Sequence, residues 1–145
     1  MRRIGWTLVI LMAASGCRAE RRAESLTVNE VATSAERPDP WREARERGID
    51  FRATGQEPGW YLEIDDGVSM RLIYDYGERS VVTPAPVVTT GTARTTYSGK
   101  TSTQVVTVVV EERPCEDVMS GEPSPQTVTV TIAGRALRGC GRLLR

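Results

Sequence analysis

Histidine is absent from this chain of 145 residues, lysine occurs once, at Lys100, and phenylalanine occurs once, at Phe51. The absence of histidine removes the commonest general base and the commonest metal ligand of proteins. Lys+Arg and Asp+Glu number 19 each, so the net charge is zero and the basic stripe of a nucleic-acid-binding protein is missing. We therefore expect no nucleic-acid partner, no metal site and no cofactor.

The groups that remain for catalysis are poorly arranged. Lys100 lies in Ser98-Gly-Lys-Thr101, which lacks the upstream glycine of a phosphate-binding loop and is not followed by a helical pattern. The acidic pairs Asp65-Asp66, Glu111-Glu112 and Glu116-Asp117 are adjacent in sequence, and adjacent side chains point apart on a strand. We therefore predict that the protein is not an enzyme.

Long apolar runs are also missing, apart from one at the start of the chain. Arg2 and Arg3 precede an apolar stretch over residues 4–14, and small residues lead to Cys17. This pattern is typical of a secretory signal peptide. The stretch is too short for a transmembrane helix, which needs about 20 residues. The sequence therefore predicts a signal peptide over residues 1–17.

The residues before Cys17 resemble a bacterial lipobox, in which the cysteine is acylated and becomes the mature N-terminus. Ala14-Ser-Gly-Cys17 has the small residues, although Ala14 stands where leucine is usual. The alternative is ordinary cleavage after an Ala-x-Ala-like site. The resemblance implies lipidation of Cys17, with two or three acyl chains anchoring the protein stably in the membrane. Arg18, in place of the aspartate that retains lipoproteins in the inner membrane, favours the outer membrane, facing the periplasm.

Residues 18–48 have the composition of a tether. Seven arginines and seven acidic residues leave little apolar area there, which predicts a flexible charged spacer. Asp39 as N-cap, Pro40 at the first helical position and Gly48 as the stop predict a short helix over 40–47. Trp41 either docks on the following domain or remains in a solvated, half-formed turn.

From residue 49 to 145 the apolar residues follow a strand period. Thr127–Ile132 alternates strictly, and Asp65-Asp66-Gly67 is a hairpin signal between two apolar runs. Val105–Val110 is β-branched or apolar throughout, which favours a central strand with both faces covered. Seven or eight short strands predict an all-β domain, a small antiparallel barrel or sandwich. The other extended runs are Ile49–Ala53, Trp60–Ile64, Val68–Tyr74, Ser80–Val82, Val87–Tyr97 and Ala136–Leu144.

If Cys17 carries lipid, Cys115 and Cys140 remain as an even pair in an oxidising compartment. A bond between them closes a loop of about 25 residues, worth roughly 3–4 kcal/mol. The alternative, a redox pair, lacks Cys-x-x-Cys spacing and a neighbouring cation. We therefore predict a structural disulfide.

Two motifs resemble a family of bacterial envelope lipoproteins of uncharacterised activity. The first is Gly55-x-Glu57-Pro58-x-Trp60, and the second is Cys115-x-Asp117-x-Met119-Ser120 with the closing pair Gly139-Cys140. The resemblance covers residues 49 to 143 and implies a small β domain held to the envelope by lipid. One departure is Ser124-Pro125, where relatives often place Tyr-Pro.

The motif residues have two interpretations. In the first they are folding devices: Gly55 and Pro58 form a turn that fixes Trp60, and Glu57 accepts backbone N–H bonds or pairs with an arginine. Asp117 and Ser120 then cap a turn through backbone amides. In the second, the loop over 115–125, with Met119 and Gly121, is a recognition surface presented by rigid strands.

The function that the sequence favours is a structural or protein-interaction role in the envelope, without catalysis and with an envelope protein as partner. The alternative is an inhibitor or binding module for an envelope-directed enzyme such as c-type lysozyme. Lipoprotein inhibitors of that enzyme insert a Ser-Gly-x-x-Tyr loop, and Ser120-Gly121 is similar in its first two residues, with Ser124 in place of the tyrosine. The sequence does not set the oligomeric state.

Overall fold

The computed structural model describes residues 38–145, so the predicted signal peptide, Cys17 and the tether residues 18–37 lie outside the described residues. The described part is a β domain with one short helix, which confirms the predicted all-β class. Its elements are α1 (Pro40–Glu46), β1 (Phe51–Gln56), β2 (Gly59–Asp65), β3 (Ser69–Tyr74), β4 (Arg79–Pro84), β5 (Val87–Thr90), β6 (Arg94–Lys100), β7 (Val105–Glu111), β8 (Cys115–Glu116), β9 (Pro123–Ser124), β10 (Gln126–Ile132) and β11 (Arg135–Leu143).

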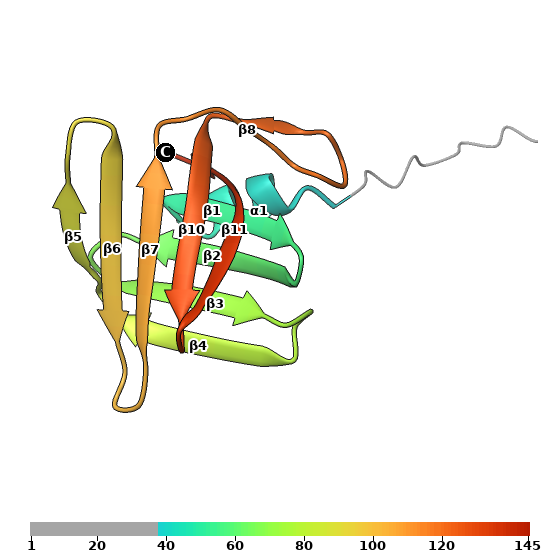
Figure 1. The fold of residues 1–145 in the computed structure, drawn as a ribbon. Helices are drawn as coiled ribbons and strands as arrows, with labels where there is room; N and C mark the ends of the chain where they lie inside the picture. Colours follow the sequence, from blue (N-terminus) through green and yellow to red (C-terminus); the bar gives the residue numbers. More distant parts are fainter. Residues whose placement is uncertain (1–37) are drawn as a thin grey trace, which may run out of the picture. The chain divides into compact units, whose positions relative to one another are not determined.

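Nine strands of the described part form one antiparallel sheet in the order β4-β3-β2-β1-β11-β10-β7-β6-β5, and β8 pairs with β9. The sheet curls into a half-barrel, so that β1–β4 cross behind β7 and β10 (Figure 1). At the place where β4 approaches β6, a Cβ on Gly99 would lie 2.7 Å from Met70 Cε and would overlap the Thr83 hydroxyl. Glycine at this position therefore lets the two ends of the sheet close on each other.

The concave inner face of the sheet holds the core, because alternate side chains of each strand point to it. In β2, Trp60, Leu62 and Ile64 are buried, and in β10 Val128, Val130 and Ile132 are buried. The remaining core residues are Phe51, Ala53, Met70, Leu72, Tyr74, Val106, Val108, Val110 and Leu137. Within residues 38–145, α1 and the segment after β7 lie on the outer face, where Trp41 contacts Arg142 and Cys115 is bonded to Cys140.

The tight turns follow the local sequence. Ala133 and Gly134 connect β10 to β11 with φ of 48° and 75°, which is the left-handed pair of a two-residue hairpin. Gly67, with φ of 74°, lies in the predicted hairpin between β2 and β3. These turns set the register in which the inner faces of neighbouring strands align.

Two strand predictions need correction. The extended run Val87–Tyr97 is two strands, because the chain reverses between Thr90 and Arg94, where the Gly91 N–H bonds to the Arg94 carbonyl at 2.7 Å. The β7 strand lies inside the sheet, but only one of its faces is fully buried, and Val105 is 49% exposed. The reason is that no second sheet covers the outer face of β7 in the described part of the chain.

The predicted short helix is present and ends at Glu46. Asp39 caps it, accepting from the backbone N–H groups of Trp41 and Arg42 at 3.0 and 3.2 Å, and Gly48 stops it with φ of 85°. Ala44 is fully buried, so α1 packs on the domain. The part of the expected tether over residues 38–48 is therefore folded, and the packed domain starts before residue 49.

Candidate functional site

The Gly-x-Glu-Pro-x-Trp motif holds an indole in the core. Gly55 lies opposite Trp60 across β1 and β2, and a Cβ on it would overlap Nε1 of the Trp60 ring and lie 2.6 Å from its Cε2. A Cβ on Gly139 would come within 2.8 Å of the same ring and would overlap the Thr54 carbonyl oxygen. Trp60 is 5% exposed and donates its Nε1–H to the Arg138 carbonyl at 3.3 Å. Gly55, Gly139 and Trp60 are thus structural.

Glu57 has a different role from the two that the sequence predicts. It lies with Pro58 in the turn between β1 and β2, where the Glu57–Pro58 peptide is cis, and its carboxylate accepts the Tyr76 hydroxyl at 3.1 Å. This hydrogen bond is the main cause that raises the pKa of Tyr76 above its ordinary value. In the described residues the partner of Glu57 is therefore a phenol rather than a backbone amide or an arginine, and no local signal in the sequence identifies Tyr76.

The loop over residues 115–122 is organised by Asp117. Its Oδ1 accepts the backbone N–H groups of Met119 and Ser120 at 3.0 and 2.8 Å and the Ser120 hydroxyl at 3.0 Å. The Ser120 hydroxyl oxygen in turn accepts the Glu122 N–H at 3.2 Å, and Gly121 has φ of 69°. These are the turn-capping contacts expected for aspartate and serine at this spacing.

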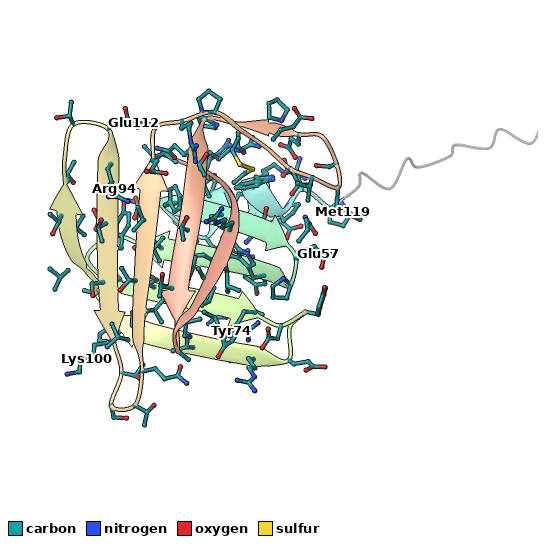
Figure 2. All side chains as sticks on the ribbon, viewed as in Figure 1. Glu57, Tyr74, Arg94, Lys100, Glu112 and Met119 are labelled. Carbon is teal, nitrogen blue, oxygen red and sulfur yellow. A yellow bond between two sulfur atoms is a disulfide. The ribbon has the colours of Figure 1, made fainter. Side chains whose placement is uncertain are left out.

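The two motifs meet in space. Gln56, inside the first motif, donates its Nε2–H to Asp117 Oδ2 of the second motif at 3.0 Å, across 61 residues of sequence. Glu57 and Met119 accordingly lie on the same side of the domain (Figure 2). The Gln56 hydrogen bond is the largest cause that lowers the pKa of Asp117, and the bonds from Ser120 and Met119 add to it.

The predicted disulfide is present. Cys115 and Cys140 are bonded, with their Cα atoms 5.5 Å apart. Cys140 lies in β11 and is buried, whereas Cys115 begins the loop, so the bond fixes the loop to the outer face of the sheet. The loop is thus held at Cys115 by a covalent bond and at Asp117 by Gln56.

Two hollows flank this loop. The helix-side hollow has a volume of about 350 Å³ and lies between the loop and α1, and the disulfide-side hollow has about 200 Å³. Thr54, Gln56 and Asp117 line both. Between them the loop exposes two apolar side chains, Val118 and Met119, which are 79% and 75% exposed.

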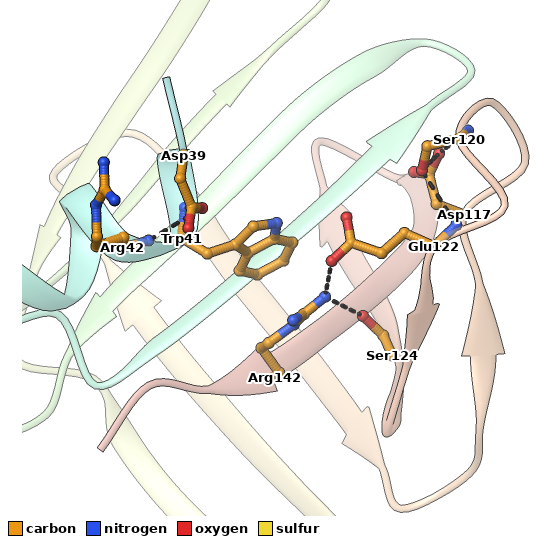
Figure 3. Close-up of polar contacts among 8 residues, drawn as sticks. All are labelled: Asp39, Trp41, Arg42, Asp117, Ser120, Glu122, Ser124 and Arg142. Atoms are coloured by element: carbon orange, nitrogen blue, oxygen red, sulfur yellow. Dashed lines mark hydrogen bonds and ion pairs between the residues drawn. The ribbon is translucent and has the colours of Figure 1, made fainter. Parts of the chain in front are cut away.

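The wall of the helix-side hollow contains the Trp41 indole with the Arg142 guanidinium group against it (Figure 3). Arg142 lies 4.4 Å and Arg52 5.8 Å from the ring of Trp41. Arg142 also pairs with Glu122 and contacts the Ser124 hydroxyl at 3.5 Å. Of the two alternatives for Trp41, docking on the domain is therefore the one that the structure shows. Sequence reasoning missed both arginines.

Beneath α1, Glu63 is buried, with 7% of its surface exposed, and it pairs with both Arg52 and Arg47. Arg47 follows α1, so this carboxylate ties the end of the helix to β1 and β2. A buried carboxylate with two cationic partners is strongly destabilising if its partners are removed. This cluster serves to dock the helix.

In the part of the chain that the structure describes, no group of three or more Cys, Asp and Glu side chains is placed to hold a metal ion. Within residues 38–145 there is also no helix of the length and hydrophobicity that a bilayer crossing requires.

Replacing Gln56 with alanine is expected to raise the pKa of Asp117 towards the ordinary aspartate value of about 3.9, because its main hydrogen-bond donor is removed. NMR titration of the Asp117 carboxyl group measures this change. Folding lowers this pKa, so the ionised carboxylate stabilises the fold above about pH 4, and the contribution is lost as the pH falls through the lowered pKa. Gln104→Ala, in a distant turn, should leave the titration unchanged; an equal shift in both variants would contradict the assignment.

Comparison of the chain with known proteins supplies no relative from which a role can be transferred. No family model, no curated protein and no solved structure matches it.

Proposed function

We propose that this protein is a lipid-anchored component of the bacterial envelope whose β domain binds a protein partner through the loop over residues 115–122. The signal-peptide pattern and the lipobox resemblance at Cys17 support the anchor and an outer-membrane location facing the periplasm. The role proposed is structural or protein-interacting, without catalysis. The resemblance of the two motifs to envelope lipoproteins supports the same proposal, a lipid-anchored envelope component.

The observation that carries the interaction is the exposure of Val118 and Met119 on a loop that is fixed at several points. Two adjacent exposed apolar side chains gain free energy when a partner covers them, and a preorganised loop loses little entropy on binding. The disulfide, the Asp117 turn and the Gln56 bond supply that preorganisation. Methionine is also well suited to adapt to a partner's surface.

Inhibition of c-type lysozyme is a narrower form of this proposal. Ser120 and Gly121 do lie on the exposed loop, but the Ser120 hydroxyl is already engaged with Asp117 and the Glu122 N–H. A serine that must reach into an enzyme cleft would have to give up both contacts. A turbidity assay decides the matter, because unaltered lysis by lysozyme at excess protein rejects that partner.

The proposal is tested in the bacterium that makes the protein, with a photoreactive amino acid placed at Met119. We expect a discrete crosslinked adduct in the envelope fraction, and none from the same amino acid at Val68, which is 61% exposed on the β2–β3 hairpin. In parallel, labelled palmitate should mark the wild-type chain and fail to mark Cys17→Ser. Equal adducts at both positions, or none, would overturn the loop interaction, and label retained on Cys17→Ser would overturn the anchor.

A further inference from the structure

A third hollow lies on the outer face of β1, β2 and β3, away from the tip of the 115–122 loop. Its volume is about 310 Å³, at the lower end of the range for small-molecule sites. Tyr61, Ile73 and Tyr76 give it apolar and aromatic walls, and Thr54 and Gln56 contribute polar groups. We call it the tyrosine hollow.

The Tyr76 wall is held in place at a conformational cost. Asp75 and Tyr76 both adopt the left-handed region, with φ of 53° and 57°, which costs about 1–2 kcal/mol for each non-glycine residue. Arg135 bonds both oxygens of Asp75 at 2.8 and 2.9 Å, and the Tyr76 N–H bonds to the Gly59 carbonyl at 2.8 Å. The Tyr76 ring nevertheless remains 71% exposed, so this bracing does not serve the core.

The Tyr61 wall is also fixed. The guanidinium carbon of Arg52 lies 4.8 Å from the centroid of the Tyr61 ring, and Arg52 is itself held by the buried Glu63. Tyr61 therefore cannot turn freely in the solvent. Two tyrosines with limited motion and the half-buried Ile73 form preorganised walls, which reduces the entropy lost on binding.

The polar side chains that line this hollow offer both donors and acceptors: the Arg52 guanidinium, the Thr54 hydroxyl and the Gln56 amide. Gln56 uses its amide nitrogen on Asp117, which leaves the amide oxygen, and Glu57 receives the Tyr76 hydroxyl on Oε2, which leaves Oε1. Within residues 38–145, no hydrogen bond engages these two remaining oxygens or the Thr54 hydroxyl. A ligand with hydroxyl groups, which both donate and accept, can satisfy these groups. Arg52, the cation of the lining, already pairs with Glu63, and the Glu57 carboxylate beside Tyr76 disfavours an anion.

From these features we infer that the tyrosine hollow binds a neutral saccharide. A pyranose ring has hydroxyl donors around its edge, and its faces carry C–H groups that pack on the electron-rich faces of aromatic rings. A proline-rich segment also docks on aromatic walls, but proline has no N–H and so brings no donor for the Gln56 amide oxygen. This site goes beyond the proposed function and does not depend on a partner of the 115–122 loop.

The test is isothermal titration of the purified full-length chain, in a detergent without a sugar headgroup, with cellotetraose, chitotetraose and decaproline. We expect at least one tetrasaccharide to bind and decaproline not to bind. Tyr76→Ala should weaken saccharide binding by about tenfold or more, because an aromatic wall is lost. Tyr76→Phe, which keeps the ring, should remain within about threefold of the wild type.

A second variant keeps the test decisive if Tyr76→Ala fails to fold. Thr54→Val removes one acceptor with little change in shape, and it too should weaken binding while leaving the circular dichroism spectrum unchanged. Val68→Ala, on the β2–β3 hairpin, is the matched control and should bind like the wild type. The inference is overturned if neither tetrasaccharide binds at millimolar concentration, if Tyr76→Ala and Thr54→Val both bind as the wild type does, or if decaproline binds and Tyr76→Ala abolishes that binding.

Discussion

Replacing Gly139 with alanine is expected to lower the free energy of unfolding by about 3 kcal/mol or more, at the upper end of the usual cost of overpacking. The new methyl group would overlap the Thr54 carbonyl oxygen and approach Trp60 Cζ2 to 2.8 Å. Neither neighbour can move easily, because Thr54 pairs with Cys140 in the β1–β11 ladder and Trp60 is part of the core. Urea denaturation followed by circular dichroism measures the loss.

The matched control is Gly91→Ala. The nearest atom to a Cβ at Gly91 is the Arg94 carbonyl oxygen at 3.5 Å, an ordinary contact, and Gly91 does not have a positive φ. Its substitution should change the stability by no more than about 0.5 kcal/mol. Gly55→Ala, on the other side of Trp60, should resemble Gly139→Ala. A similar small effect at all three glycines would show that the indole is not held as described.

Loss of the Cys115–Cys140 bond, by reduction or by joint replacement with alanine, is expected to destabilise the domain by about 3 kcal/mol. The bond closes a loop of 25 residues and fixes the 115–122 loop to β11. Without it, the unfolded chain gains freedom, and the folded loop keeps the β8–β9 pairing and the polar contacts of Asp117 and Glu122 but loses its covalent link to β11. Urea denaturation in the presence and absence of a reductant measures the difference.

The double alanine variant provides the control for this experiment. Because it has no bond to reduce, the reductant should not alter its unfolding midpoint. If the wild-type chain also unfolds at the same urea concentration with and without reductant, the disulfide does not contribute to stability as predicted.

Features that depend on a few neighbouring residues could be predicted from the sequence. The strict alternation in Thr127–Ile132 indicates β10 because a strand with one buried face requires it. Asp39, Pro40 and Gly48 predict α1 because capping is a local hydrogen-bond problem. The disulfide followed from the cysteine count and the expected compartment.

Features that depend on the register of distant strands could not be predicted. Gln56 reaches Asp117 only because β1 pairs with β11, to which the disulfide fixes the loop, and no local pattern encodes that pairing. The contacts of Trp41 with Arg52 and Arg142 join three separate parts of the chain. No local signal marks the reversal within Val87–Tyr97, because threonines lie on both sides of Gly91.

The position of β11 has a consequence for biosynthesis. This strand, Arg135–Leu143, lies between β1 and β10 and forms the connection between the β4–β1 half of the sheet and the β10–β5 half. Until it has been synthesised, the two halves are separate meanders, each with an unpaired edge and half of the inner face exposed. Contacts between residues so distant in sequence slow folding, and exposed edges invite aggregation. We therefore expect the nascent domain to be most prone to aggregation until translation has passed its final strand.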